Sequence, residues 1–324
     1  MRSTQRPSII DRERRPFFSI VIPTYNRAHT IGETIRSCRR QRYNDFELLI
    51  VDDGSTDDTE AVVRSIGDPR IRYLRRDNGG PAAARNTGID AARGRYIAFL
   101  DSDDRFAPEK LQVFHDHIVA TSARACYGPM YVDRGVGRMW IRPDSGMRDG
   151  ENVFDYLFLR RGVFLISTLV VETTLARRCR FLESLWYGDN DQFAVDLWRQ
   201  GTRLDYIPQP LSIYTDHGDN RLSQCPVFAT DSEIHTHFFD WVESHRAEMS
   251  TRAYLAYRAR FRSRLTARSS RREAAKELIS AWRADALSGR DCLRQSVQTF
   301  LPNVYRHCAD LVARSRGAQM GESN

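Results

Sequence analysis

Short apolar runs alternate with segments of helical periodicity along the first hundred residues of the chain. The apolar runs start at residues 19, 46, 71 and 96, at intervals of 25 to 27 residues. We expect strands at 19–24, 46–51, 71–74 and 96–100, because short apolar runs bounded by turn residues are typical of buried strands. Strands and helices that alternate at this spacing predict an α/β fold with a mostly parallel, doubly wound sheet and flanking helices.

Three helices are expected between these strands. Thr30 and Glu33 have the spacing of a capping box at the start of the first helix. Asp57 is expected to cap the second helix, and the third is expected to span 82–93. The helices would cover the sheet and bury its apolar strands.

The regular alternation stops after Arg105, and the second half of the chain has a less regular, mixed pattern. A helix that carries Phe193 and Leu197 is expected to end at Gly201. After residue 245 the pattern becomes arginine-rich helix with an apolar stripe at spacings of three and four residues. The stripe consists of Tyr254, Tyr257, Phe261 and Leu265.

These changes in pattern predict three parts of the chain. Residues 1–16 are polar and basic without periodicity, and we expect them to be disordered. The main domain is expected at 17–240, with a regular first half at 17–104 and a less regular second half at 105–240. A basic helical extension follows at 241–324. From Arg246 to the end there are 16 basic and 7 acidic residues, so this extension carries +9 and the first 245 residues carry −2 of the total charge of +7.

Composition narrows the class of protein. No apolar run approaches the roughly 20 residues of a membrane span; the best candidate, at 162–171, reads as a buried strand or helix. The arginine-rich start lacks the apolar stretch of a secretory signal. The six cysteines show no C-x-x-C spacing, which favours reduced thiols over a disulfide framework or a zinc site. We therefore expect a cytoplasmic protein.

Polar and glycine residues gather where the predicted strands end. The segments are 23–26, 52–55, 79–86 and 101–104. In open α/β sheets ligands bind beyond the carboxyl ends of the strands. We therefore expect the functional site to be built from these four segments.

The acidic cluster Asp101-Ser-Asp-Asp104 directly follows the fourth strand. Three neighbouring carboxylates repel one another unless a positive group lies among them, and hard divalent cations such as Mg²⁺ or Mn²⁺ prefer oxygen ligands. Such a metal would stabilise the charge on a departing diphosphate. The alternative is an acidic turn that caps the following helix, and the position at a strand end favours the metal site.

The other three segments each allow a structural and a functional interpretation. Asp52 can brace a tight turn, or a carboxylate of this turn can bind a base or a ribose. Pro23-Thr-Tyr-Asn26 can stack a base on its aromatic side chain, or only lead into the first helix. Arg85 can contact a phosphate or hold a carboxylate in a structural ion pair.

Together these segments resemble the inverting family 2 glycosyltransferases, which have the GT-A fold. The resemblance is carried by Phe18-Ser-Ile-Val-Ile-Pro-Thr-Tyr-Asn26, Phe46-Glu-Leu-Leu-Ile-Val-Asp-Asp-Gly-Ser55, Ala83-Ala-Arg-Asn-Thr-Gly88 and Gly94-Arg-Tyr-Ile-Ala-Phe-Leu-Asp-Ser-Asp-Asp104. It is strong over 17–112, weaker to about residue 220 and absent from the extension. It implies a sugar transfer from a nucleotide-sugar, mostly a UDP-sugar and less often a GDP- or dTDP-sugar, to an acceptor hydroxyl.

The resemblance also implies that 17–104 is a nucleotide-binding half and 105–240 an acceptor half, and it implies roles for single residues. Pro23 and Tyr25 would flank the base and Asp53 would bind it. Asp101 and Asp103 would form the D-x-D motif, with Asp103 as the direct ligand of Mn²⁺ or Mg²⁺. Further candidates for nucleotide binding are Asn26, Arg85, Asn86 and Ser102.

The general base is less clear, because the chain departs from the family at this point. Family members usually carry a Glu-Asp pair before a helix of the second half, and the aspartate is the base. In the matching stretch, 186–193, that position falls on Asn190, which has no titratable group. Asp189 and Asp191 flank it. We favour Asp191, because Asp189 lies nearer the expected helix cap, where backbone N–H groups would lower its basicity.

The expected partners are a nucleotide-sugar and a glycan or lipid-linked acceptor, as in relatives that assemble surface polysaccharides. The apolar stripe of the extension either lies on an anionic membrane surface, or packs on the main domain or in an oligomer contact. His217 either reaches the diphosphate or is exposed in a loop. No nucleic-acid-binding module is visible.

Two other functions are compatible with an α/β chain that carries aspartates. A nucleotidyltransferase would usually have a glycine-rich, basic loop after the first strand, where this chain has Pro-Thr-Tyr-Asn. A protein that kept the fold and lost catalysis is favoured only by Asn190. Both rank below the sugar transfer.

Overall fold

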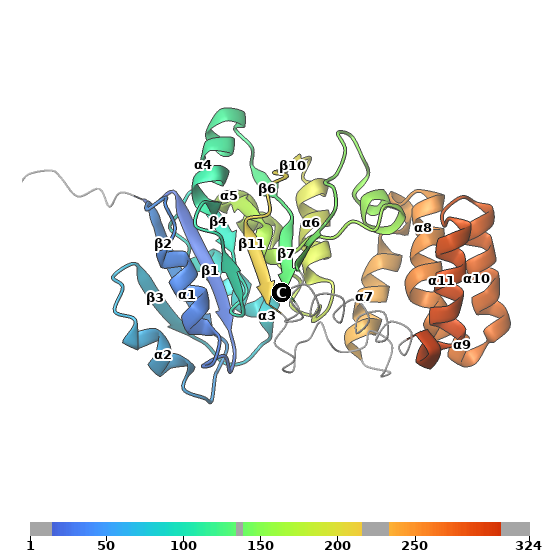
Figure 1. Ribbon diagram of the computed structural model, residues 1–324, viewed down its shortest axis with the longest axis horizontal. Helices are drawn as coiled ribbons and strands as arrows, with labels where there is room; N and C mark the ends of the chain where they lie inside the picture. The colour runs from blue at the N-terminus through green and yellow to red at the C-terminus, as the bar shows by residue number, and fades with distance from the viewer. Residues whose placement is uncertain (1–14, 134–138, 216–232, 306–324) are drawn as a thin grey trace, which may run out of the picture.

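A seven-stranded sheet forms the centre of the structure, with strand order β10-β6-β9-β4-β1-β2-β3 (Figure 1). The computed structural model describes residues 15–133, 139–215 and 233–305. The strands are β1 (Phe18–Thr24), β2 (Phe46–Asp52), β3 (Ile71–Arg75), β4 (Tyr96–Phe99), β6 (Ala125–Tyr127), β9 (Val170–Glu172) and β10 (Leu204–Tyr206). The first four run parallel to one another, and β9 is antiparallel to β4 and β6. The predicted α/β fold with a mostly parallel sheet is confirmed.

The four expected strands differ from β1 to β4 by at most one residue at either end. Every residue of β1 and β2 is buried, because helices cover both faces of the sheet. Successive side chains of a strand point to opposite faces. Val21 accordingly belongs to one hydrophobic cluster, and its neighbours Ile20 and Ile22 belong to another.

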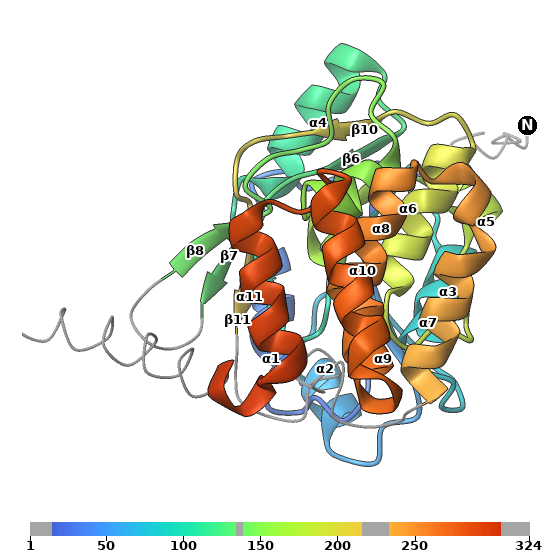
Figure 2. The same cartoon turned by 90° about the vertical axis from the view of Figure 1, so that its right-hand side faces the viewer.

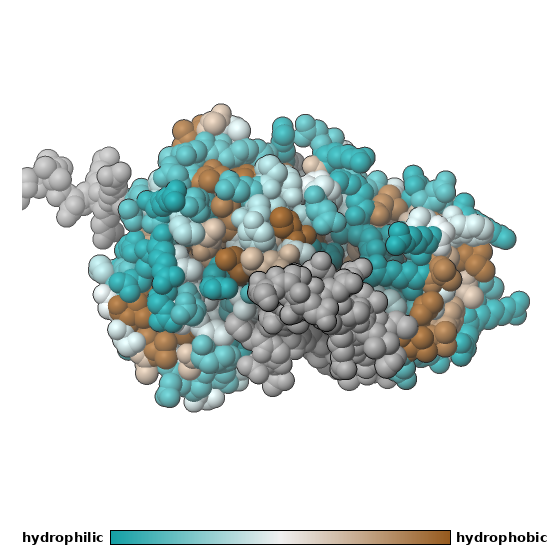
Figure 3. All heavy atoms as spheres, in the orientation of Figure 1, coloured by the Kyte–Doolittle hydropathy of each residue, from teal (hydrophilic) through white to brown (hydrophobic). Residues whose placement is uncertain are grey.

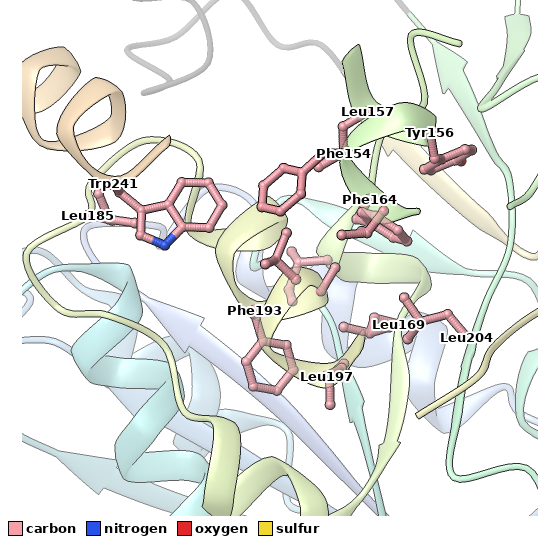
Figure 4. Packing of buried hydrophobic residues seen from close by; sticks show 14 of the residues in the cluster. Phe154, Tyr156, Leu157, Phe164, Leu169, Leu185, Phe193, Leu197, Leu204 and Trp241 are labelled. Atoms are coloured by element: carbon pink, nitrogen blue, oxygen red, sulfur yellow. The ribbon is translucent and has the colours of Figure 1, made fainter. Parts of the chain in front are cut away.

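Six helices cover the two faces of this sheet. They are α1 (Ile31–Arg39), α2 (Thr59–Ser65), α3 (Pro81–Ala91), α4 (Lys110–Thr121), α5 (Thr173–Cys179) and α6 (Asp189–Arg199). Residues of α1, α2 and α4 join the cluster of Ile20, whereas α3, α5 and α6 contribute to the cluster of Val21. Figure 4 shows part of this second cluster, in which Phe193 and Leu197 of α6 lie near Leu169 and Phe164.

A second sheet of four strands has the order β5-β11-β7-β8. Its strands are β5 (Asp104–Phe106), β7 (Met130–Asp133), β8 (Met139–Arg142) and β11 (Ser212–Thr215). Two short elements that are not α-helical lie between β8 and β9 in the sequence. They are the π-helical η1 (Asp155–Leu159) and the 3₁₀ turn η2 (Ile166–Thr168). Because β5 begins at Asp104, the acidic turn after β4 leads directly into the first strand of this sheet.

The carboxyl-terminal part is helical and lies on the side of the molecule away from β3 (Figures 1 and 2). Its elements are α7 (Glu233–Ser244), η4 (Arg246–Glu248), α8 (Thr251–Tyr257), η5 (Arg258–Arg262), α9 (Ser263–Ser269), α10 (Arg271–Arg283) and α11 (Gly289–Phe300). Residues from α7 to α10 belong to the same hydrophobic cluster as Val21. The core is therefore continuous across the boundary that the sequence analysis places near residue 240.

The apolar stripe of the extension faces this core. Tyr257 is fully buried, and its ring lies 5.3 Å from that of Phe158 in η1. Phe261 lies 5.9 Å from Phe158, and Tyr254 and Leu265 pack against the same cluster. Of the two interpretations, packing on the main domain is correct and the membrane-facing stripe is wrong. Figure 3 shows hydrophobic residues on the outer surface of these helices, but the stripe is not among the exposed ones.

The structure confirms some of the predicted helix caps and contradicts others. Thr30 is the N-cap of α1 but makes no side-chain cap bond, and Glu33 pairs with Arg36, so the predicted capping box is wrong. Asp57 accepts the N–H of Thr59 at 3.1 Å, although α2 has Asp58 as its N-cap. The expected end of α6 is confirmed, because Gly201 follows the helix with a φ of +67°.

The described residues also test two expectations from composition. Cys38, Cys126, Cys179 and Cys292 are free cysteines, of which the first two are buried and the last two partly buried. Among the helices of the described ranges, none combines the length and the apolar character that crossing a bilayer requires.

We expect Tyr257→Ala to lower the free energy of unfolding by about 3 to 5 kcal/mol, because it leaves a large cavity in the shared core. Urea unfolding should remain a single transition, since the extension and the sheet share one cluster. Leu293→Ala is the matched control, because Leu293 in α11 is 69% exposed and its loss should change stability by less than about 0.5 kcal/mol. Two separate transitions, of which Tyr257→Ala shifts only one, would contradict the continuous core.

Candidate functional site

The carboxyl ends of three parallel strands meet at one edge of the sheet. Thr24 of β1 is paired in register with Asp52 of β2, and Val21 of β1 with Phe99 of β4. The strand order changes direction between β1 and β4, since β2 and β3 lie on one side of β1 and β4 on the other. The segments 23–26, 52–55 and 101–104 therefore surround the switch point where doubly wound sheets bind ligands.

A buried arginine joins this edge to the second half of the chain. Arg85 of α3 donates from one guanidinium nitrogen to Asp101 Oδ1 at 2.8 Å, and from the other to Asp189 at the start of α6. The Arg85 side chain is only 7% exposed. Asp189 is thus brought to the acidic turn after β4, although the two segments are almost 90 residues apart. The structure shows an ion-pair role for Arg85.

Asp101 and Asp103 would provide the oxygen donors of the predicted metal site. Asp103 is largely buried and lies 3.9 Å from Arg27 Nε. Within the described ranges, no three His, Cys, Asp or Glu side chains converge into a complete metal site. The donor set nevertheless fits Mg²⁺ or Mn²⁺, because these cations accept one or two protein carboxylates when substrate phosphates supply further oxygens.

Ser167 of η2 holds the acidic turn through two hydrogen bonds. The hydroxyl of Ser167 accepts the N–H of Asp101 at 3.0 Å and donates to Asp104 Oδ2 at 2.6 Å. Lys110 of α4 donates to the carbonyls of Thr168 at 3.1 Å and Ser167 at 3.4 Å. Burial lowers the pKa of Lys110 to about 7. The sequence analysis missed this brace; its only signal was a pair of hydroxyl residues inside the apolar run at 162–171.

Asp53 shapes the loop between β3 and α3. Its carboxylate accepts the N–H groups of Gly80 at 2.7 Å and Gly79 at 3.1 Å, and pairs with Arg76 at 2.7 Å. Gly80 has a φ of +89°, and a Cβ there would lie 3.1 Å from the ring of Trp186. Glycine is required here both for the backbone and for the close approach of Trp186. A base that binds Asp53 would share these acceptor oxygens.

The remaining nucleotide candidates lie at the same edge in different settings. Tyr25 is 46% exposed at the end of β1, with Pro23 inside that strand. Asn26 accepts the N–H of Thr56 at 2.8 Å and so ties two strand-end loops together. Asn86 exchanges two hydrogen bonds with the backbone of Phe181. Ser102 is buried in the acidic turn, and His217 lies outside the described residues.

The two candidate bases lie on different faces of α6. Successive helix residues are rotated by about 100°, so positions 189 and 191 are roughly 200° apart. Asp189 faces Arg85, whereas Asp191 accepts the backbone N–H of Phe164. Burial and the charge of Asp189 raise the pKa of Asp191 to about 7. Asp191 also lies beside Tyr187, because its charge contributes to the raised pKa of that phenol.

Comparison with known families agrees with this geometry. The family described as "Glycosyl transferase family 2" matches residues 19–186, which is more than half of the chain. The chain belongs to this family. The match includes the strand-end segments, the acidic turn, Arg85 and Ser167, and it ends three residues before α6.

Relatives by sequence and solved structures of similar fold are also found for this chain. An Escherichia coli protein, "UDP-Glc:alpha-D-GlcNAc-diphosphoundecaprenol beta-1,3-glucosyltransferase WfgD", is 41% identical over 34% of this chain and 44% of its own length. The crystal structure of Staphylococcus aureus TarS 1-349 in complex with UDP-GlcNAc has a TM-score of 0.56 at 17% identity, covering 87% of this chain and 90% of that one. Mannosyltransferase PcManGT from Pyrobaculum calidifontis, in complex with GDP-Man and Mn²⁺, has a TM-score of 0.56 at 19% identity and covers 95% and 88%. These structures share the GT-A fold.

The sequence matches are limited in extent. Across other curated relatives, the matched segment spans 14% to 66% of their own length.

We expect the stability of Asp191→Asn relative to the parent to depend on pH. With a folded pKa near 7 against 3.8 for the unfolded chain, Asp191 holds a proton only in the folded state between about pH 4 and 7. Its contribution to stability therefore falls as pH rises through this window and stays low above it. Asp191→Asn should match the parent near pH 4 and be more stable at pH 8 by about 1 to 3 kcal/mol.

Urea unfolding at the two pH values measures this difference. Asp240→Asn, which removes an exposed carboxylate of α7, is the matched control and should behave alike at both. An equal effect of Asp191→Asn at pH 4 and pH 8 would show that Asp191 titrates normally.

Proposed function

We propose that this family 2 chain transfers a sugar from a UDP-sugar to an acceptor hydroxyl with inversion, in the assembly of a polysaccharide or glycoconjugate. The observation that carries the proposal is the ion pair of Arg85 with Asp101 and Asp189. It brings a D-x-D motif and the acidic start of α6 together at the carboxyl edge of a parallel sheet. The UDP-Glc in the name of WfgD and the UDP-GlcNAc of the TarS complex support UDP, and the GDP-Man of PcManGT makes GDP the alternative.

The donor would lie over the carboxyl ends of β1, β2 and β4. The exposed ring of Tyr25 and the edge of Pro23 would flank the base, and Asp53 would accept a hydrogen bond from it. Asn26 and Asn86 would act by holding the loops in place, since their side chains are bonded within the protein. Ser102 would lie beneath the diphosphate as part of the acidic turn.

A divalent cation, Mn²⁺ or Mg²⁺, would be held by Asp103 with help from Asp101. When bound, it supplies positive charge that stabilises the diphosphate as the bond to the sugar breaks. Ser167 keeps the two carboxylates in position through the N–H of Asp101 and the carboxylate of Asp104. Asp189 is neutralised by Arg85 and has a structural role.

Asp191 is the proposed general base. It takes the proton of the acceptor hydroxyl while the oxygen bonds to the anomeric carbon and the bond from that carbon to the diphosphate breaks. A base with a pKa near the working pH is best suited to this step, and the pKa of Asp191 is about 7. Asp189 is the weaker candidate, because its ion pair with Arg85 would have to be broken first.

Removal of the metal carboxylate should abolish turnover without unfolding the protein. We expect Asp103→Asn to lower the rate of UDP release from UDP-sugars by at least about a hundredfold, since it removes a charge opposite the diphosphate. Asp116→Asn, on the exposed surface of α4, is the matched control and should keep full activity. Thermal-shift measurements with UDP, GDP or dTDP and Mn²⁺ identify the nucleotide, because binding to the folded state raises Tm. Wild-type turnover of Asp103→Asn in EDTA would disprove the metal-dependent proposal.

The two aspartates of α6 should give different defects. Asp191→Ala should lose transfer but bind UDP with Mn²⁺ as tightly as the parent, and kcat/KM of the parent should rise with pH and level off above about 7. Asp189→Ala should instead destabilise the fold, because it leaves the buried Arg85 with one partner. Normal turnover of Asp191→Ala together with an inactive, stable Asp189→Ala would assign the base to Asp189.

A further inference from the structure

An arginine-rich pocket lies where the carboxyl-terminal helices meet the acceptor half. Its volume is about 330 Å³, and its lining includes residues of β8, η5, α9 and α11 as well as 161–163 and Tyr187. The charged residues of the lining are Arg142, Arg161, Arg260, Arg264, Arg294 and Asp291. Five guanidinium groups thus face one carboxylate. A pocket of this composition favours an anionic ligand.

Among the described residues of the lining, the one carboxylate is shared by two arginines. Asp291 lies 3.4 Å from Arg161 and 3.9 Å from Arg260. Arg260 is only 12% exposed, and burial together with the charge of Arg161 lowers its pKa to about 10. Arg264 donates to the amide oxygen of Gln298. A bound anion would therefore stabilise the buried charge of Arg260.

Hydrogen bonds within the protein hold the guanidinium groups of Arg260 and Arg294 in place. Arg260 donates to the carbonyl of Phe158 at 2.9 Å, and its own carbonyl accepts the side-chain amide of Gln295 at 3.1 Å. Arg294 donates to the hydroxyl of Tyr305 at 3.0 Å. Arginines held by such bonds lose little conformational entropy when they bind an anion, and their planar groups fit phosphate oxygens.

The pocket adjoins the proposed base. Tyr187 lines it, and the charges of both Asp191 and Arg264 act on its phenol. Gly162 and Val163 also line it, and the next residue, Phe164, donates its N–H to Asp191. A molecule that fills the pocket therefore lies beside the carboxylate that would deprotonate the acceptor.

We propose that this pocket binds a phosphate group of the acceptor, so that the acceptor is a phosphorylated molecule whose hydroxyl is held near Asp191. The inference rests on the proposed sugar transfer. The phosphate can belong to a lipid-linked glycosyl diphosphate or to a water-soluble sugar or polyol phosphate, and the same guanidinium groups would bind either. No bond to the phosphate forms or breaks, because it serves only to hold the acceptor.

Phosphate binding can be measured apart from catalysis. We expect inorganic phosphate, titrated in EDTA, to raise the Tm of the parent and of Asp103→Asn alike. The double variant Arg264→Gln/Arg294→Gln should lose this shift, because glutamine keeps polar contacts but removes the charge. Arg272→Gln, an exposed arginine of α10 outside the pocket, is the matched control and should respond like the parent. Loss of the shift in Asp103→Asn but not in the double variant would place the phosphate at the donor site and overturn the proposal.

Kinetics with paired acceptors provide the second test. KM for a phosphorylated acceptor should rise at least about tenfold in the double variant, as expected for lost charge-assisted hydrogen bonds, while KM for the UDP-sugar stays unchanged. A lipid-linked glycosyl diphosphate in phosphatidylcholine vesicles and a soluble glycosyl phosphate are compared to identify the source. Equal use of the same glycan without phosphate, or an unchanged KM in the double variant, would refute the pocket's role.

These experiments distinguish a failure of the proposed sugar transfer from a failure of the proposed phosphate binding. If the parent releases no UDP with any acceptor, the sugar transfer fails, whatever phosphate does to Tm. If the parent transfers to a neutral acceptor and the double variant does so equally well, the transfer stands and the inference about phosphate fails.

Discussion

The buried ion pair of Arg85 with Asp101 and Asp189 is the contact on which the site depends. Without the guanidinium, two carboxylates from distant parts of the chain would approach each other in a poorly solvated place, and each would need a counter-charge. With it, α6 is held against the carboxyl end of β4, and the second half of the chain is fixed relative to the first. One side chain of α3 thus determines both where the acidic turn lies and where α6 begins.

Other polar contacts hold the same turn from the opposite side. Ser167 binds both the backbone of Asp101 and the carboxylate of Asp104, and the buried amine of Lys110 binds the carbonyl groups of η2. These groups lie in the core, where an unpaired polar atom is costly, so their geometry is strongly determined. The guanidinium of Arg85 and the hydroxyl of Ser167 therefore both hold the acidic turn in one conformation. This favours a site that is already in its binding geometry before a ligand arrives.

The sequence predicted the parts of the structure that local patterns specify. The strands β1 to β4 and the end of α6 at Gly201 follow from runs of apolar residues and from a glycine at the required position. The capping box failed because Glu33 found a partner in Arg36, one turn along its own helix. The brace by Ser167 and the burial of Tyr257 depend on partners dozens of residues away. No local pattern identifies such partners, so a stripe that packs on η1 has the same sequence as one that would lie on a membrane.

In the proposed reaction, the donor and the acceptor would be bound by parts of the chain that differ in their relation to the family. The family match ends at residue 186, and it contains the strand ends, the acidic turn and Arg85. The carboxyl-terminal helices come after it, and they contribute more than half of the residues that line the arginine-rich pocket. The donor would therefore lie on the matched strand ends, whereas the phosphate of the acceptor would lie between Tyr187, 161–163 and helices outside the match. Because the carboxyl-terminal helices pack against the same hydrophobic cluster as the sheet, the two proposed sites would be held in place relative to each other.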